Sequence, residues 1–578
     1  MTVAAASGAT TAATDRTRTV AGAVLHFLRD TLGCDRLFTV PGEAFLPLLD
    51  AAGDDGLTVV TSRHEGGAAF GALADARLTG RPAVVAVNRS PGATNASIAL
   101  DAATADPTPL LLVVGGADRG TDPVLGFQGT DIAALLGGIA PVVVLAGPDD
   151  LPAACARIAQ ALGGPVPGPA VLVVPEDLWD EPSGESGPAT PRRPAALRPT
   201  GHARQPLRAA HAAAGRVRDL LAGADRPVLL AGRLLRTGGS PEPGPALGRL
   251  AHTAVLPVLL GNKQQDLLDN HHPHYAGHLH LGTPAVTRAR LAGADLVVLL
   301  GDLPDEVHLT GWYDGRQRLV TVHPDPRGPG ELLAADPAEV LAELAADPTG
   351  AEAPGAAGED GRPDGDRRAW LTGWRTLETG LAAAAPRPRP DGLDFALIAD
   401  ALDRRLPDDA VLTLDAGNFS SWIHRHVRLR PGQRLLALAG GSMGFGVPAA
   451  AAAALRHPDR VAVAVVGDGG VLMTGNELAS AQAGGRRPVV IVADNGSYGT
   501  IRAHAARRGA ATDCATALHT PDLVRWARSF GLPAELVTEP HQADPAVRRA
   551  LASRDGYLLH VRTSLQAVHA NFDLPSSC

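Results

Sequence analysis

The sequence predicts an α/β protein with three doubly wound domains, each built on a parallel sheet. Short apolar runs of strand length alternate with helical patterns along most of the chain, and this alternation is typical of parallel sheets. Two segments rich in Pro, Gly and charge interrupt the alternation, at 180–206 and 346–367. A chain of 578 residues also has the length of about three domains of ordinary size.

The composition argues against several classes of protein. The net charge of −9 provides no basic footprint for nucleic acid. No apolar run reaches the roughly 18 residues that span a bilayer, and the first 16 residues lack the apolar core of a signal peptide. The four cysteines have neither disulfide nor metal spacing, which favours a reducing cytoplasm; they are Cys34, Cys155, Cys514 and Cys578.

Domain boundaries follow from the linkers and the apolar patterns. In chain order we expect a disordered N-terminus (1–16), an N-terminal domain (17–180), a linker (181–206), a central domain (207–345), a flexible linker (346–388), a C-terminal domain (389–570) and a tail (571–578).

In the N-terminal domain, the apolar run from Leu57 to Val60 precedes a helical stretch at 63–81, RHEGGAAFGALADARLTGR. Glu65 lies near the start of this stretch. A glutamate at a helix end is most often a solvated residue. In an apolar pocket, however, its ionised form would be disfavoured, and the carboxyl group could then exchange a proton with a base.

In the central domain, strand-like runs occur at 227–231, 254–260, 296–300 and 319–323. Five histidines cluster between the second and third runs, at positions His271, His272, His274, His278 and His280. No cysteine or carboxylate pair completes a zinc spacing around them. A polar, loop-facing or interface role is therefore favoured over a metal site.

In the C-terminal domain, Asp468 follows a buried strand at 461–466 and Asn495 follows the next, at 489–492. The carboxyl ends of neighbouring parallel strands lie side by side, so both oxygen donors can face one point. Oxygen ligands on Gly-rich turns suit Mg²⁺ bridged to a phosphate.

This GDG…N pattern, from Gly467 to Asn495, resembles the diphosphate-binding motif of thiamine diphosphate enzymes. The stretch at 63–81 is similar to the HE…A…A…ARxTG segment of members that act on 2-oxo acids. Five more segments match in family order, and they are PGE at 41–43, SPGATN at 90–95, FQGTD at 127–131, DAGNFSSW at 415–422 and GGSMGFGVPAA at 440–450. The resemblance covers roughly residues 17–570 and points to the acetolactate synthase-like group.

The resemblance implies pyrimidine-binding, central and diphosphate-binding domains in that order, with thiamine diphosphate and Mg²⁺ as cofactors. It implies Asp468, Asn495 and the carbonyl of Ser497 as metal ligands. Glu65 would be catalytic through a hydrogen bond to the cofactor's aminopyrimidine, and Gln128 through a hydrogen bond to the oxyanion that develops on the substrate. The other implied cofactor-binding residues are Asn95, Ala416, Gly417, Asn418, Gly441, Ser442, Met443, Gly469, Gly470, Tyr498, Gly499 and Thr500.

The chain departs from the family pattern at several positions. Ser90 and Gly129 replace the usual Gly and Glu of their segments. Asp494 stands where Asn is more frequent, and it adds a charge beside the metal turn without serving as a ligand. Leu303 stands where many relatives have Arg. FAD, which acetolactate synthases bind in this domain, therefore lacks one basic anchor here, and it stays a possible but unsupported cofactor.

The implied function is decarboxylation of a 2-oxo acid, pyruvate by default, and transfer of the remaining acyl group to a carbonyl acceptor. The implied assembly is a homodimer or homotetramer with the active site at the subunit interface. A simple 2-oxo acid decarboxylase, a specialised C–C ligase or lyase, and a non-catalytic regulatory relative remain open. A nicotinamide dehydrogenase and a P-loop protein are disfavoured, because neither GxGxxG with its acid nor GxxxxGK[ST] is present.

Overall fold

The computed structural model describes residues 19–54, 57–183, 204–236, 242–346, 363–483, 487–510 and 513–574. The chain forms two compact units, Met1–Arg198 and Pro199–Cys578. The predicted disordered N-terminus lies outside the described residues, as does most of the first linker.

The first unit is built on one six-stranded parallel sheet with the order β2-β1-β3-β4-β6-β5. Its strands are β1 (Arg36–Thr39), β2 (Thr58–Thr61), β3 (Ala83–Asn88), β4 (Leu110–Gly116), β5 (Val142–Val144) and β6 (Ala170–Pro175). Its α-helices are α1 (Val20–His26), α2 (Leu46–Asp54), α3 (Glu65–Thr79), α4 (Arg89–Ala105), α5 (Ile132–Leu136) and α6 (Leu151–Leu162). Helices α1, α2 and α6 pack on one face of the sheet, and α3 and α4 on the other, so β4 is buried along its whole length.

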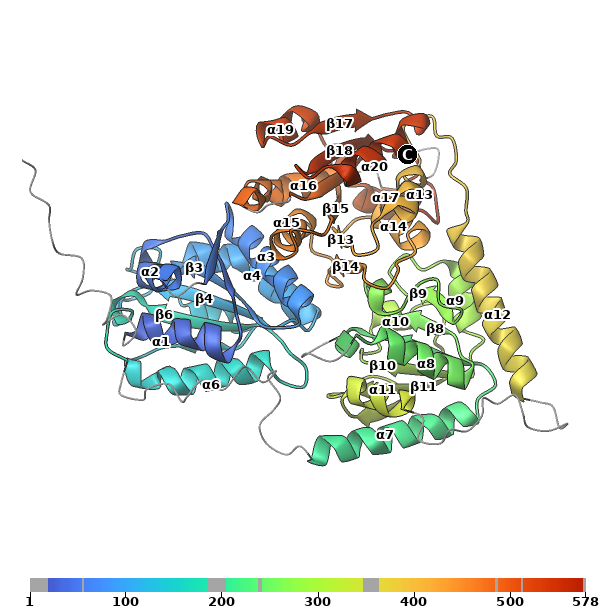
Figure 1. The fold of residues 1–578 in the computed structure, drawn as a ribbon, viewed down its shortest axis with the longest axis horizontal. Helices are drawn as coiled ribbons and strands as arrows, with labels where there is room; N and C mark the ends of the chain where they lie inside the picture. Colours follow the sequence, from blue (N-terminus) through green and yellow to red (C-terminus); the bar gives the residue numbers. More distant parts are fainter. Residues whose placement is uncertain are drawn as a thin grey trace, which may run out of the picture. The chain divides into compact units, whose positions relative to one another are not determined.

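The second unit contains two more six-stranded parallel sheets. The central sheet has the order β12-β11-β10-β7-β8-β9. Its strands are β7 (Pro227–Ala231), β8 (Val258–Leu260), β9 (Tyr275–His278), β10 (Leu296–Leu300), β11 (Arg318–His323) and β12 (Glu331–Ala334). Helices α7 (Arg204–Ala222), α8 (Gly244–Ala254) and α11 (Pro337–Ala345) pack on one face, and α9 (Ala285–Leu291) and α12 (Pro363–Ala382) on the other (Figure 1). The short α10 (Glu306–Leu309) follows β10.

The C-terminal sheet has the order β14-β13-β15-β16-β18-β17. Its strands are β13 (Val411–Leu414), β14 (Arg434–Ala437), β15 (Ala462–Gly467), β16 (Val489–Asp494), β17 (Ala534–Val537) and β18 (Tyr557–Arg562). Its α-helices are α13 (Ala396–Arg405), α14 (Ser420–His426), α15 (Gly446–Arg456), α16 (Asp468–Thr474), α17 (Gly499–Arg507), α18 (Asp513–Thr516), α19 (Leu523–Ser529) and α20 (Ala543–Ala552). The predicted fold class, three doubly wound parallel sheets, is thereby confirmed. Among the helices that the structure describes, none is both long and apolar enough to cross a membrane.

Two segments differ from the sequence prediction. The predicted flexible linker at 346–388 contains α12, whose Trp374 is fully buried against the central sheet. The guanidinium of Arg290 lies over the ring of Trp370, 4.8 Å from its centroid, and stabilises this packing. Composition misled here because a tryptophan anchors a helix only through partners that are distant in sequence. The described part of the predicted tail, 571–574, also packs, since Leu574 is buried with Ala503 and Val568.

Histidines join the central and C-terminal sheets of the second unit. The His278 ring lies 5.0 Å from His280 and 4.9 Å from His424, centroid to centroid. His424 also faces the amine of Lys263, with 2.9 Å between Nζ and Nε2, and its Nδ1 lies 3.1 Å from Gln265 Oε1. Two histidines of the predicted cluster thus lie at this interface.

Burial lowers the pKa of His278 to about 3, with a further contribution from Lys263. Burial and Lys263 likewise hold the pKa of His424 well below its usual range. Burial lowers the pKa of the nearby His569 to about 4. These side chains are therefore neutral in the folded protein at neutral pH.

We predict that the second unit loses stability as the pH falls below about 6.5, the ordinary pKa of histidine. Below that value the unfolded chain binds protons that the folded chain excludes, so the free energy of unfolding decreases. Each such histidine contributes up to about 1.4 kcal/mol per pH unit. Urea unfolding followed at a series of pH values measures the slope.

The variant His278→Gln should flatten the dependence of the free energy of unfolding on pH. In the wild type, the ring Nε2 of His278 has no hydrogen-bond partner, so the substitution breaks no hydrogen bond at that atom. The matched control is His211→Gln, whose side chain is 75% exposed. Equal slopes for the wild type and His278→Gln would contradict the prediction.

Candidate functional site

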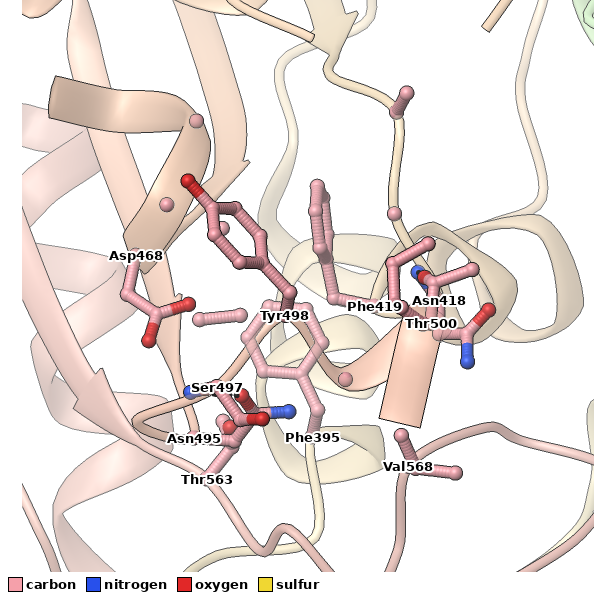
Figure 2. A pocket seen from close by; sticks show the side chains of 18 of the residues that line it. Phe395, Asn418, Phe419, Asp468, Asn495, Ser497, Tyr498, Thr500, Thr563 and Val568 are labelled. Atoms are coloured by element: carbon pink, nitrogen blue, oxygen red, sulfur yellow. Dashed lines mark hydrogen bonds between the residues drawn. The ribbon is translucent and has the colours of Figure 1, made fainter. Parts of the chain in front are cut away.

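A cavity of about 250 Å³ opens at the carboxyl edge of the C-terminal sheet. It is lined by the segments that follow β13, β15, β16 and β18, together with the loop before α15 (Figure 2). The strand order reverses between β13 and β15. Ligands of open α/β sheets bind at such a switch point, because the loops on its two sides diverge and leave a crevice.

Asp468 begins α16 directly after β15, and its side chain points into the cavity (Figure 2). The residue is only 5% exposed, and its Oδ2 is buried without a hydrogen-bond partner. Burial and the adjacent carboxylate of Asp494 raise the pKa of Asp468 well above its usual range. A buried carboxylate oxygen without a donor is costly unless a cation binds it.

The turn after β16 brings Asn495 and Ser497 to the same cavity. The Ser497 N–H donates to Asn495 Oδ1 at 3.1 Å, and Gly496 between them has a φ of +68°. Ser497 is also held by its hydroxyl, which donates to the carbonyl of Thr516 at 3.0 Å. A carboxylate, an amide and a main-chain carbonyl are all oxygen donors, and this donor set fits Mg²⁺.

Most of the other predicted cofactor-binding residues of the C-terminal domain also line this cavity. They are Ala416, Gly417, Asn418, Gly441, Met443, Gly469, Gly470, Tyr498, Gly499 and Thr500. Ser442 is not among the lining residues. The N–H of Asn418 donates to Thr500 Oγ1 at 3.1 Å and so connects the segment after β13 to α17.

Asp415 supports the cavity and was not among the predicted site residues. It follows β13, and its carboxylate accepts the N–H groups of Gly444, Phe445 and Gly446 at 3.0, 2.8 and 3.1 Å. Burial raises its pKa to about 6. A Cβ at Gly470 would lie 2.2 Å from Asp415 Oδ2, so the turn after β15 approaches this carboxylate only because residue 470 is glycine.

Apolar and C-terminal residues complete the cavity, and sequence reasoning missed them. They are Phe395, Phe419, Trp422, Ile501, Thr563, Ser564, Ala567 and Val568. Apolar side chains in a sequence indicate a core as readily as a pocket. The segment at 563–568 had a usable signal, because it directly follows an apolar strand, and strand ends of a parallel sheet meet at one edge.

The predicted residues of the first unit form a separate group. Asn95 Nδ2 donates to Glu65 Oε2 at 2.9 Å, and His64 caps the N-terminus of α3 by accepting the Gly66 N–H at 3.0 Å. Gln128 has a positive φ of 52°, and its Oε1 accepts from Asn88 Nδ2 at 3.3 Å. Glu65 is half-exposed within this unit, so its own domain does not supply the apolar pocket expected for it.

Three family models match the chain in sequence. They are described as the N-terminal TPP binding domain, the central domain and the C-terminal TPP binding domain of thiamine pyrophosphate enzymes, and they match residues 18–135, 215–345 and 415–561.

Relatives that are similar over nearly the whole chain support the same family. The acetolactate synthase large subunit of Parasynechococcus marenigrum (strain WH8102) is 29% identical, over 94% of this chain and 88% of the relative. The acetolactate synthase isozyme 2 large subunit of Escherichia coli (strain K12) is 27% identical, over 93% of this chain and 94% of the relative. The solved thiamine diphosphate-dependent 4-hydroxybenzoylformate decarboxylase of Rhodococcus jostii RHA1 has a TM-score of 0.78 at 24% identity, over 96% of this chain and all of that chain, and it shows a shared fold.

We predict that Asp468 and Asp415 respond oppositely to neutralisation in metal-free protein. Asp468→Asn removes a carboxyl group that has an unpartnered oxygen and a like-charged neighbour, so it should stabilise the protein by about 1 kcal/mol. Asp415→Asn leaves at least one buried N–H without an acceptor and should destabilise it by about 1–3 kcal/mol. Thermal unfolding of both variants in the presence of a chelator measures the two effects, and a loss of stability in both would refute this prediction.

Proposed function

We propose a function from the premise that the chain belongs to the thiamine pyrophosphate enzyme family, whose three domain models match regions of its three sheets. The proposed reaction is of the acetolactate synthase type. The enzyme decarboxylates a 2-oxo acid, with pyruvate as the default donor, and transfers the remaining acyl group to a carbonyl acceptor. Relatives over nearly the full length named acetolactate synthase support this choice.

The observation that carries the proposal is the unpartnered, buried Oδ2 of Asp468 in a cavity lined by oxygen donors. We propose that Asp468, Asn495 and the carbonyl of Ser497 hold Mg²⁺, and that the surrounding glycine turns allow a diphosphate to approach the backbone. When bound, thiamine diphosphate supplies the group that accepts the electron pair released by decarboxylation. Phe395, Phe419 and Trp422 contribute an apolar wall, which keeps water from the cofactor.

In the first unit, Glu65 and Gln128 have the proposed catalytic roles. Asn95 donates to Glu65 Oε2 and thereby orients the carboxyl group toward a proton exchange with the aminopyrimidine ring. Asn88 donates to the side-chain oxygen of Gln128, which leaves the amide N–H groups of Gln128 for the oxygen of the substrate carbonyl.

We propose that two copies of the chain complete each active site, in a homodimer or homotetramer. The loop before α5 exposes apolar side chains beside Gln128, and Val124, Leu125 and Phe127 are 89%, 83% and 70% exposed. Such a patch favours a protein–protein interface. A second copy could also supply the apolar surroundings that Glu65 lacks in its own domain. We further propose a cytoplasmic location, because no disulfide joins the cysteines that the structure describes.

The proposed function includes no step with FAD. The switch point of the central sheet lies between β7 and β10, where a dinucleotide would bind. There Arg233 pairs with Asp302 at 3.1 Å, and both side chains are largely buried. A Cβ at Gly232 would lie 2.4 Å from the Asp302 Cβ, so the two strand ends are closely packed. These features lend no support to a flavin dinucleotide at this switch point.

We predict Mg²⁺-dependent binding of thiamine diphosphate to metal-stripped protein in calorimetric titrations. The variant Asp468→Ala should weaken this binding by more than about 100-fold, since even residues outside a coordination shell contribute up to that factor. A wild type that fails to bind the cofactor in the presence of Mg²⁺ would refute the proposed function.

We predict that Glu65→Gln lowers turnover of pyruvate by about 10²- to 10⁴-fold, the size of a general acid–base contribution, with little change in cofactor affinity. The control is Glu181→Gln, because Glu181 belongs to the same unit and forms an ion pair with Arg119. Full turnover by Glu65→Gln would exclude the assigned role.

Product analysis in the same assay separates the alternatives. With pyruvate alone, and then with added aldehydes, a carboligase forms new carbon–carbon bonds, whereas a simple decarboxylase releases an aldehyde. Binding of the cofactor without any product would favour a non-catalytic regulatory relative.

A further inference from the structure

Asp494 is the last residue of β16, and it lies between the metal carboxylate and the next strand of the sheet. On one side β16 pairs with β15, which is directly followed by Asp468. On the other side β16 pairs with β18, and Arg562 of β18 is the register partner of Asp494. The side chain of Asp494 is fully buried. It therefore connects the proposed metal site to a strand that supplies no ligand.

The carboxylate of Asp494 accepts four hydrogen bonds. Oδ2 accepts from His560 Nε2 at 2.6 Å and from Arg562 Nη1 at 2.5 Å. Oδ1 accepts from the Gly496 N–H at 2.9 Å and from Thr520 Oγ1 at 3.2 Å. A carboxylate accepts at both oxygens, whereas an asparagine amide would present its own donors to one of these pairs. The surroundings thus fit aspartate better than asparagine at this position.

These contacts reach the turn that carries the proposed ligands. Gly496 stands between Asn495 and Ser497, so its hydrogen bond to Asp494 holds the turn at its centre. The main-chain carbonyl of Asp494 accepts the N–H of Thr563 at 2.8 Å, and Thr563 lines the same cavity. One residue therefore fixes two of the segments around the cavity.

The charge of Asp494 also acts on the metal position. Asp468 directly follows β15 and Asp494 ends the paired strand β16, so the two negative charges would repel in the absence of a cation. His560 and Arg562 contact Asp494 from the side opposite Asp468 in the sheet order. Asp494 thus provides a second negative charge close to the cation without needing to coordinate it.

We propose that Asp494 is a positioning residue that holds the Asn495–Ser497 turn and, through its charge, tightens the binding of Mg²⁺ from outside the coordination shell, an inference that rests on the proposed function. Arg562 moderates this effect by partly neutralising Asp494. The two substitutions that remove these charges should therefore change the affinity for Mg²⁺ in opposite directions.

The test is a calorimetric titration of the metal-stripped full-length protein with MgCl₂ at saturating thiamine diphosphate. Asp494→Asn should weaken the apparent affinity for Mg²⁺ by about 10-fold or more, as for other residues outside a coordination shell. Arg562→Gln should tighten it, and the double variant should recover part of the loss. The control is Asp544→Asn, which also removes a carboxylate with two basic partners, here Arg404 and Arg405, on a helix away from the cavity.

A second readout does not need the cofactor. Hydrogen exchange of the peptide that contains residues 494–499 should be faster in metal-free Asp494→Asn than in the wild type, because the Gly496 N–H loses a charged acceptor. Thermal unfolding confirms that each variant is folded before its titration.

The outcomes separate this assignment from the proposed function. Equal affinity for Mg²⁺ in the wild type and Asp494→Asn would overturn the assignment and leave the proposed function intact. Weakening by both single variants, without recovery in the double variant, would reduce Asp494 to a structural brace and would also overturn it. A wild type that binds neither Mg²⁺ nor thiamine diphosphate would overturn the proposed function and this assignment together.

Discussion

Two acidic side chains meet at the carboxyl edge of the C-terminal sheet, and the site depends on how their repulsion is resolved. Asp468 directly follows β15 and Asp494 ends the adjacent parallel strand β16, so the sheet itself brings their carboxyl groups together. Two buried carboxylates in contact are unfavourable without compensation. Asp494 is compensated by His560 and Arg562, whereas Asp468 Oδ2 has no partner. In our proposal, this asymmetry directs the cation to Asp468.

A third carboxylate at the same edge has a structural role instead. Asp415 accepts three main-chain N–H groups from the segment that leads into α15. All three aspartates are buried, and they differ in what satisfies their oxygens. Asp415, whose donors are main-chain N–H groups, holds a loop. In our proposal, Asp468, which has an unpartnered oxygen, binds the cation, and Asp494, which has charged donors, tightens the binding of that cation. The hydrogen-bond partners of a buried acid thus indicate its role better than its burial does.

The central sheet supports the cavity through α14. Trp422 of this helix lines the cavity, and His424, two residues later, contacts Lys263 and the ring of His278 from the central sheet. Because these histidines are buried and neutral, their packing requires a pH at which they remain unprotonated. The position of one cavity wall is therefore coupled to a junction that contains none of the proposed ligands.

The sequence by itself predicted the three parallel sheets, the strands that precede Asp468 and Asn495, and the proposed oxygen donors, because these depend on local apolar runs and on glycine and carboxylate spacing. It did not predict α12 at 363–382, since composition dominated by Pro and Gly masked the burial of Trp374. Only the tertiary structure identified Asp415, the aromatic wall and the segment at 563–568, which are ordinary core or loop residues until strands distant in sequence place them together. Only the tertiary structure showed that Asp494 is surrounded by four donors, because three of them, on His560, Arg562 and Thr520, lie far from it in the sequence and reach it through the pairing of β16 with β18 and a neighbouring loop.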